Sequence, residues 1–208
     1  MYYVSLQPGL FKTFGTEFDA FWCCTGTGSE EYSKLNNSIY FHDDDAVYVN
    51  LFIPSTLNWK ERGLKLRQET KFPADDRIAL TVESAPSSTT ALKIRVPYWA
   101  TSGALYSING QQQNVSATPS TYVTLTREWK AGDVIAIEMP LTLHINTTPD
   151  DKTVQAAMYG PLVLAARLGT EDLTVGRIDG PEGPWDEGYP MPTVDLRPHP
   201  RRGPDGQL

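Results

Sequence analysis

The chain has 208 residues, of which 25 are acidic and 18 are basic, so its formal net charge is -7. This length suffices for one large domain or two modest ones with real apolar cores. An acidic chain offers no basic surface for nucleic acid, and no apolar run approaches the roughly 20 residues of a membrane helix. We therefore expect neither nucleic acid nor a membrane as a partner. Localisation stays open, because a targeting segment could lie upstream in a longer protein.

The two cysteines of the chain are adjacent, Cys23 and Cys24, and Thr25-Gly26-Thr27-Gly28 follows them. They cannot join distant segments, because a disulfide between immediate neighbours is strained and rare. On an irregular loop, however, two adjacent thiolates can reach one metal ion. A second interpretation is open, since free cysteine is also among the most buried residue types.

The residues after the cysteine pair predict a short helix. Thr27 and Glu30 have the spacing of a capping box, which predicts a helix that begins near Gly28 and runs toward residues 36–37. The cysteines would then precede a helix N-terminus, where free N–H groups and the helix dipole favour a thiolate. Glu30 and Glu31 are interpreted mainly as capping and first-turn charges.

The middle of the chain has the period-two pattern of β-strands, with Gly, Pro, Asn and Asp between the runs. Seven short strands at this spacing predict a mostly β fold, an antiparallel, jelly-roll-like β-sandwich. The predicted strands are residues 38–41, 46–52, 64–71, 77–83, 91–96, 122–126 and 134–138. Further strands are expected at 141–146, 154–158 and 162–166, either in the same sandwich or at the start of a second one.

The alternation also predicts which side chains face the core. The nine expected core or partly buried positions are Val47, Val49, Leu51, Ile78, Leu80, Val82, Leu92, Ile94 and Val96. His42-Asp43-Asp44-Asp45 is interpreted as a solvated hairpin turn, because it lacks the spaced ligands of a calcium loop. Core positions are the default for Trp99 and Trp129, whereas Trp22 and Trp185 are weak candidates for contact with a sugar.

The motifs together resemble a known family. Phe21-Trp22-Cys23-Cys24-Thr25-Gly26-Thr27-Gly28, with Glu30, Lys34 and Ile39-Tyr40-Phe41-His42 after it, is similar to the signature of the β-L-arabinofuranosidases of glycoside hydrolase family 127 and the related family 146. Four downstream runs resemble the family's β-sandwich region in order: residues 92–100, Ser107-Ile108-Asn109-Gly110, Trp129-Lys130-Ala131-Gly132-Asp133 and residues 159–165. The resemblance extends to about Gly169.

The resemblance implies a site and a chemistry. It implies that Cys23 is the nucleophile of a retaining hydrolase, that Cys23 and Cys24 bind Zn²⁺, and that an arabinose-containing glycan is the substrate. In the family, a glutamate and a third cysteine complete the zinc site, and a further glutamate is the acid/base. All three residues come from the part of a helical barrel that precedes the motif. This sequence lacks that part and has no third cysteine. We therefore expect a C-terminal portion that is inactive alone and whose partner is the missing N-terminal barrel.

Four regions are predicted. Residues 1–37 are the edge of an (α/α)6 barrel with the cysteine motif, 38–147 the β-sandwich, 148–169 further strands, and 170–208 an irregular tail rich in proline and glycine. Two other functions are open: a carbohydrate-associated β-sandwich module without chemistry of its own, and a thiol or metal-binding protein unrelated to sugars.

Overall fold

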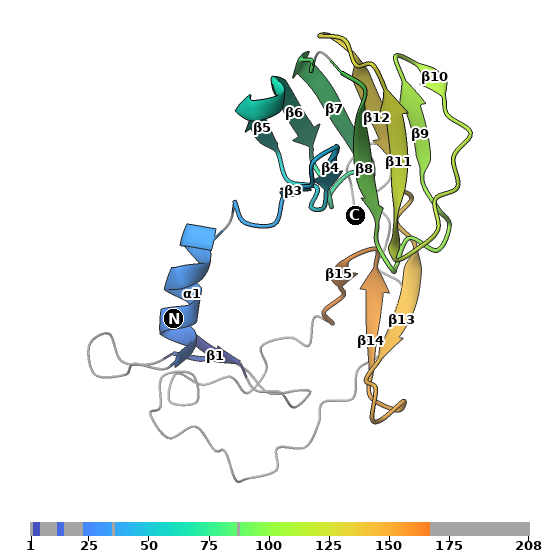
Figure 1. Ribbon diagram of the computed structural model, residues 1–208. Coiled ribbons are helices and arrows are strands. Elements are labelled where there is room, and N and C mark those ends of the chain that lie inside the picture. Colours follow the sequence, from blue (N-terminus) through green and yellow to red (C-terminus); the bar gives the residue numbers. More distant parts are fainter. Residues whose placement is uncertain (1, 5–11, 15–22, 35, 87, 167–208) are drawn as a thin grey trace, which may run out of the picture. The chain divides into compact units, whose positions relative to one another are not determined.

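The computed structural model describes residues 2–4, 12–14, 23–34, 36–86 and 88–166. Asn36–Ala165 form one compact unit (Figure 1). Outside this unit lie the antiparallel pair β1 (Tyr2–Val4) and β2 (Lys12–Phe14) and the helix α1 (Cys23–Lys34). The tail predicted at 170–208 lies outside the described residues, as do Trp22 and Trp185.

Each of the seven strands predicted for residues 38–138 is present. They are β3 (Tyr40–His42), β4 (Ala46–Val49), β6 (Leu64–Thr70), β7 (Arg77–Ser84), β8 (Thr90–Val96), β11 (Thr121–Arg127) and β12 (Val134–Glu138). Three further strands and a short 3-10 helix were not predicted: β5 (Ser55–Trp59), η1 (Lys60–Arg62), β9 (Leu105–Ile108) and β10 (Gln111–Gln112). β5, β9 and β10 extend the sheet that the predicted strands form.

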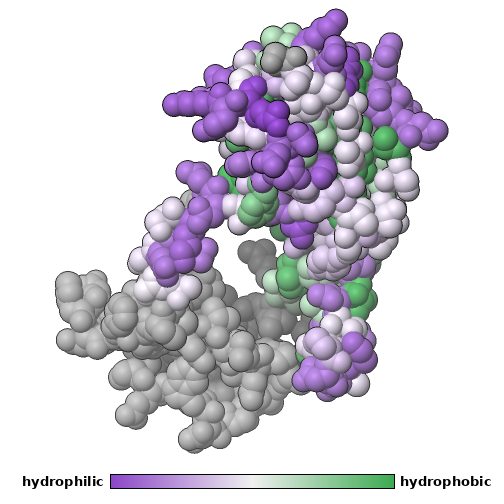
Figure 2. All heavy atoms as spheres, viewed as in Figure 1, coloured by the Kyte–Doolittle hydropathy of each residue, from purple (hydrophilic) through white to green (hydrophobic). Residues whose placement is uncertain are grey.

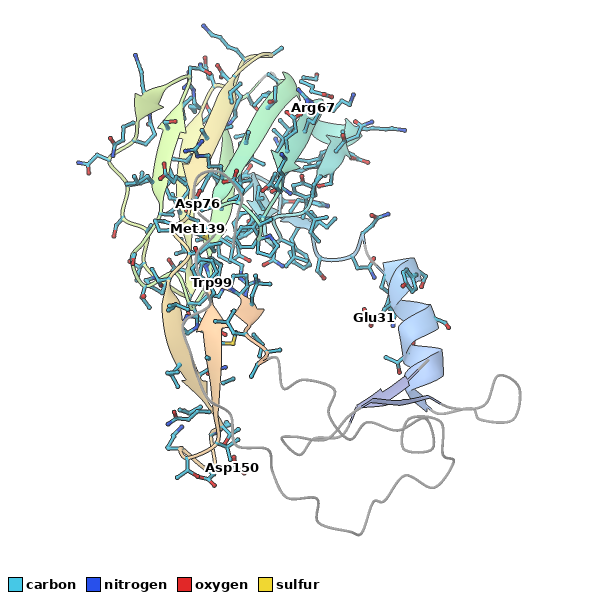
Figure 3. All side chains as sticks on the ribbon, turned by 180° about the vertical axis from the view of Figure 1, so that it is seen from behind. Glu31, Arg67, Asp76, Trp99, Met139 and Asp150 are labelled. Atoms are coloured by element: carbon cyan, nitrogen blue, oxygen red, sulfur yellow. The ribbon has the colours of Figure 1, made fainter. Side chains whose placement is uncertain are left out.

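Two sheets make up the sandwich. One has six strands in the order β10-β9-β12-β7-β6-β5, and the other has four in the order β11-β8-β4-β3. A single apolar cluster holds residues from both sheets, among them Leu66, Leu80 and Ile135 from the first and Val49 and Ile94 from the second. The mostly β sandwich that the sequence predicts is therefore confirmed. Trp99 and Met139 also belong to this core (Figure 3).

The buried side chains of the sandwich follow the period-two alternation that the sequence predicts. Eight of the nine expected positions are buried, and Leu51 is partly buried. Along β8, every second side chain from Thr90 to Val96 is buried, whereas Lys93 and Arg95 face outward. Burial of such aliphatic side chains contributes about 1.5 to 3 kcal/mol each relative to leaving them exposed, so this row holds the sheets together.

One ladder departs from the antiparallel pattern. β4 pairs with β8 in parallel, with Val47 opposite Leu92 and Val49 opposite Ile94. A parallel pair needs a crossover connection, and here the chain between the two strands supplies β5, β6 and β7 of the other sheet. The remaining ladders of the described residues are antiparallel.

The last predicted strands form a separate sheet. β13 (Leu143–Thr147), β14 (Gln155–Tyr159) and β15 (Leu162–Val163) pair in that order and join neither sheet of the sandwich. Leu143, Ile145 and Tyr159 are exposed, and Figure 2 shows hydrophobic residues over this part of the molecule. The three-stranded sheet thus has a less complete apolar cover than the sandwich.

Candidate functional site

The cysteine pair lies in the first turn of α1. The helix begins at Cys23, five residues before the predicted start near Gly28, so the prediction of a loop around the pair was wrong. Thr27 lies inside the helix and does not cap it. The first turn of a helix still presents free N–H groups and the positive end of the dipole, and both favour an anion there. The side chains of Cys23 and Cys24 lie outside the description.

The two acidic residues of α1, Glu30 and Glu31, are exposed. Glu30 forms an ion pair with Lys34 one turn later at 2.7 Å, and its carbonyl accepts a hydrogen bond from Ser33 Oγ at 2.7 Å. Glu31 is exposed on the same helix (Figure 3). Both carboxylates lie past the first turn of α1, so the interpretation of Glu30 and Glu31 as capping and first-turn charges was wrong, and Glu30 instead forms an ordinary exposed i,i+4 pair.

The two cysteines by themselves are not a full donor set for zinc. A structural zinc site takes four ligands and a catalytic one takes three and a water, whereas the whole sequence offers two thiols. Among the described residues no group of three or more His, Cys, Asp or Glu side chains could hold a metal ion.

His42-Asp43-Asp44-Asp45 is exposed at the hairpin turn between β3 and β4, as the sequence predicts. Asp43 Oδ1 accepts hydrogen bonds from the backbone N–H groups of Asp45 at 3.0 Å and Ala46 at 2.7 Å, and Tyr48 Oη donates to Oδ2 at 2.7 Å. These bonds, the tyrosine's foremost, lower the pKa of Asp43 to about 2. Asp43 thus holds β3 and β4 in register as a carboxylate.

The tryptophans of the sandwich are core residues. Trp59, Trp99 and Trp129 are all buried, so none of them offers an open ring to a sugar. A depression of about 520 Å³ lies at Trp59, but His42 packs against the ring at 5.0 Å and Arg62 lies 5.6 Å from its centroid. Trp129 Nε1 donates to the buried Thr90 carbonyl at 2.9 Å.

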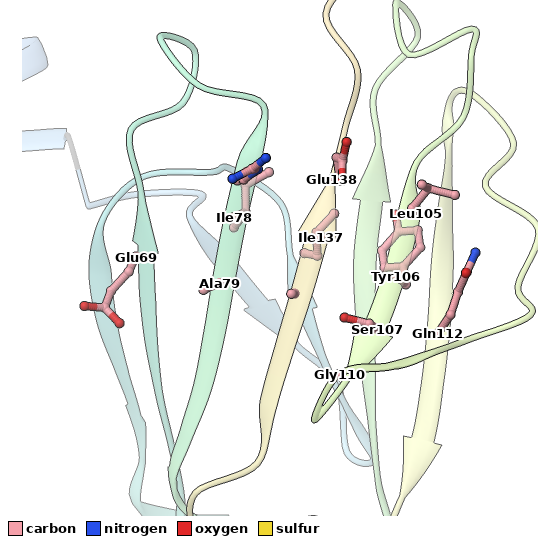
Figure 4. A pocket seen from close by; sticks show the side chains of 12 residues that line it. Glu69, Ile78, Ala79, Leu105, Tyr106, Ser107, Gly110, Gln112, Ile137 and Glu138 are labelled. Atoms are coloured by element: carbon pink, nitrogen blue, oxygen red, sulfur yellow. The ribbon is translucent and has the colours of Figure 1, made fainter.

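A second pocket, of about 550 Å³, lies over the outward-facing residues of the six-stranded sheet (Figure 4). Ala79, Ala136 and Ser107 lie opposite one another there on β7, β12 and β9. Because these side chains are short, the sheet is hollow at this point. The polar side chains around the hollow are Glu69, Arg77, Gln112 and Glu138. No thiol or imidazole is among its lining residues, so the pocket has no nucleophile of the predicted kind.

Tyr106 lines the same pocket from the inner side of β9. It is buried, and in the part of the chain that the structure describes its hydroxyl has no hydrogen-bond partner. Burial alone raises the pKa of Tyr106 to about 12, so the phenol stays neutral. The sequence motifs did not single out this pocket. The sequence feature that indicates this pocket is the small residues at outward-facing positions of the strands.

No helix within the described ranges is long and apolar enough to cross a bilayer.

Comparisons with known proteins agree with the fold and its motifs. Residues 46–141 match the family model for the middle domain of GH127 β-L-arabinofuranosidases. A solved structure described as a glycoside hydrolase is 28% identical with a TM-score of 0.63, and the match covers 71% of this chain and 26% of the other. No curated protein sequence gives a significant match.

Two further solved structures carry the GH127 description. A GH127 β-L-arabinofuranosidase from Geobacillus stearothermophilus T6 is 25% identical with a TM-score of 0.60, covering 68% of this chain and 23% of that one. A GH127 β-arabinofuranosidase is 24% identical with a TM-score of 0.59, covering 68% and 25%, and supports the fold alone. The chain thus spans about a quarter of the length of the structures that it matches.

Proposed function

We propose that the chain is part of a retaining, zinc-dependent glycoside hydrolase acting on β-L-arabinofuranosides, because residues 46–141 match the family model for the GH127 middle domain. The family match is the observation that carries the proposal. It supports the resemblance of the cysteine motif, which precedes the matched residues in the same chain.

In this proposal Cys23 is the nucleophile. Its thiolate attacks the anomeric carbon, a C–S bond forms as the bond to the leaving oxygen breaks, and a general acid outside this chain protonates that oxygen. Water then attacks the same carbon and gives its proton to the same acid/base group, now acting as a base, while the C–S bond breaks and the thiolate is released. Two displacements at one carbon retain its configuration.

The position of Cys23 at the start of α1 supports this role. A thiolate is favoured at a helix N-terminus, because the unpaired N–H groups and the dipole stabilise negative charge. Zn²⁺ bound to both thiols would keep them deprotonated, with Cys23 and Cys24 as two ligands and the other ligands from the rest of the complete protein.

The 208-residue chain by itself is proposed to be inactive. It has two of the zinc ligands that the family uses, and the family's acid/base glutamate lies upstream of the motif. We expect weak zinc binding and no hydrolysis of a β-L-arabinofuranoside by the isolated chain. Enzyme-like turnover by this chain would contradict the proposal.

The decisive experiment uses the complete protein. Cys23→Ser should abolish turnover even at saturating Zn²⁺, because the nucleophile is lost together with one zinc ligand, while circular dichroism should show that the fold is retained. Cys24→Ser should lower the zinc content measured by metal analysis, and activity should fall with it. Glu31→Gln, an exposed change on the same helix, is the matched control and should keep activity. Full activity of Cys23→Ser would refute the assignment of the nucleophile.

A further inference from the structure

The outer face of the four-stranded sheet carries an aromatic surface that the proposed catalytic role does not use. Phe41 on β3 lies opposite Tyr48 on β4, and Tyr48 lies opposite Lys93 on β8. Tyr122 on β11 lies opposite Arg95 on β8. The intervening side chains of β4 and β8 are buried, so these five residues share the outer side. We call Phe41, Tyr48, Lys93, Arg95 and Tyr122 the aromatic face.

The rings of the aromatic face are accessible. Phe41 is 50% exposed and Tyr122 is 38% exposed, while Tyr48 between them is half-buried. This differs from the tryptophans of the sandwich, which are covered. Neighbouring strands lie about 4.8 Å apart, so the three strand steps from β3 to β11 span roughly 14 Å. A short oligosaccharide fits along such a row.

Hydrogen bonds hold two of these rings in place. The rings of Tyr48 and Tyr122 meet edge to face, with centroids 5.4 Å apart. Tyr122 Oη donates to Asn50 Oδ1 at 2.8 Å, while Tyr48 Oη donates to Asp43 Oδ2 at 2.7 Å and accepts from Lys93 Nζ at 2.6 Å. Lys93 Nζ also lies over the Tyr48 ring, 4.4 Å from its centroid, so Tyr48 is a covered support and the open rings are those of Phe41 and Tyr122. A preordered surface loses less side-chain entropy when a ligand binds.

The charges of the aromatic face are nearly balanced. Lys93 Nζ lies 3.5 Å from Asp43 Oδ2, so the two charges compensate each other. Arg95 has no ion pair within the residues that the structure describes, and its guanidinium presents donors that a pair of hydroxyl oxygens can accept. Open rings, hydrogen-bond donors and little net charge suit an uncharged, polyhydroxylated ligand better than an anionic polymer.

We propose that the aromatic face binds a neutral oligosaccharide, with sugar rings stacked on the exposed rings of Phe41 and Tyr122 and sugar hydroxyls bonded to Arg95. Such a surface would hold the protein on a polysaccharide. Only the choice of an arabinose-containing sugar rests on the proposed function. Binding to this face requires no catalytic step.

The test is a titration of the 208-residue chain, labelled with ¹⁵N, with arabino-oligosaccharides followed by NMR. Chemical shifts should change at the amides of Phe41, Tyr48, Tyr122 and their strand neighbours. Phe41→Ala and Tyr122→Ala should each weaken the affinity about five- to tenfold, as expected for one lost aromatic contact. Tyr159→Ala, which removes a similarly exposed tyrosine from the separate β13-β14-β15 sheet, is the matched control and should change nothing.

The titration of the unmodified chain is decisive even if a variant does not fold. Chemical-shift changes that map to another surface would overturn the proposal. So would the absence of any change at about 10 mM sugar, because the affinity would then be too weak to be useful. So would loss of sugar binding in the complete protein, because the face would then be covered by the rest of the polypeptide. Self-association that Tyr122→Ala removes would identify a second copy as the occupant instead. A catalytically dead Cys23→Ser protein that still binds the sugar would separate this proposal from the proposed function.

Discussion

The indole of Trp129 gives a quantitative test of what holds the two ends of β8 and β11 together. Trp129 follows β11 directly, and its Nε1 donates to the Thr90 carbonyl at the start of β8 at 2.9 Å. Both residues are buried, so no water replaces the donor when it is removed. Trp129→Phe keeps an aromatic ring at the position but deletes that donor.

The size of the effect follows from two contributions. Loss of the hydrogen bond with a buried acceptor left behind costs about 1 to 2 kcal/mol. The smaller ring loses apolar contact area, which costs about 1 kcal/mol. We therefore expect Trp129→Phe to lower the free energy of unfolding by about 2 to 3 kcal/mol.

Trp59→Phe is the matched control. Trp59 is also buried, and an arginine lies over each ring, at 5.6 Å for Trp59 and 5.5 Å for Trp129. No hydrogen bond from the Trp59 indole is found among the described residues, so this variant should lose only about 1 kcal/mol. Urea unfolding followed by fluorescence measures both values. Equal losses in the two variants would refute the hydrogen-bond argument.

Three further predictions concern stability. The pKa of Asp43 is lowered to about 2, chiefly by the hydrogen bond from Tyr48. The stabilising effect of this carboxylate is therefore present above its unfolded pKa of about 4 and is lost as the pH falls toward 2. Asp43→Asn should flatten this part of the curve of unfolding free energy against pH. Asn109 has a positive φ of 52°, its Nδ2 donates to Asp133 Oδ1 at 2.8 Å, and its Oδ1 accepts from the Val134 N–H at 2.8 Å. Asn109→Ala should therefore lower the free energy of unfolding by about 2 to 4 kcal/mol. Asn109→Gly should lower it less, because glycine adopts this φ without strain. Ile94→Ala should cost about 2 to 5 kcal/mol in urea unfolding, whereas Thr124→Ala on the outer side of the same sheet should cost under about 0.5; similar losses would mean that Ile94 is not in the core.

The local pattern of the sequence predicted seven strands of the sandwich and missed three, β5, β9 and β10. Arg77–Ser84 and Thr90–Val96 alternate over several residues, so their period identifies both the strand and its buried side. β10 has only two residues, which is too few for a period to emerge. β5 contains the polar residues Ser55, Thr56 and Asn58, and it is a strand because it pairs along β6.

The cysteine motif shows a different limit. Its adjacent thiols and glycines indicated a site through resemblance, but the helix was placed too late. Threonine and glycine are weak helix formers, so the sequence favoured a loop through Gly28. The roles of Cys23 and Cys24 stay predictions, and so does the place of Trp22 and Trp185 near a sugar.

The sequence by itself determined that the chain is mostly β, which side chains are buried and which family its motifs resemble, because alternation, turn residues and short motifs are local properties. Only the tertiary structure decided the strand order, the parallel pairing of β4 with β8 and the separate sheet of β13, β14 and β15. It also decided that Phe41, Tyr48 and Tyr122 share one surface, although Phe41 and Tyr122 are far apart in the chain. Pairing between strands depends on which apolar faces bury one another, and that choice is made by the whole chain at once.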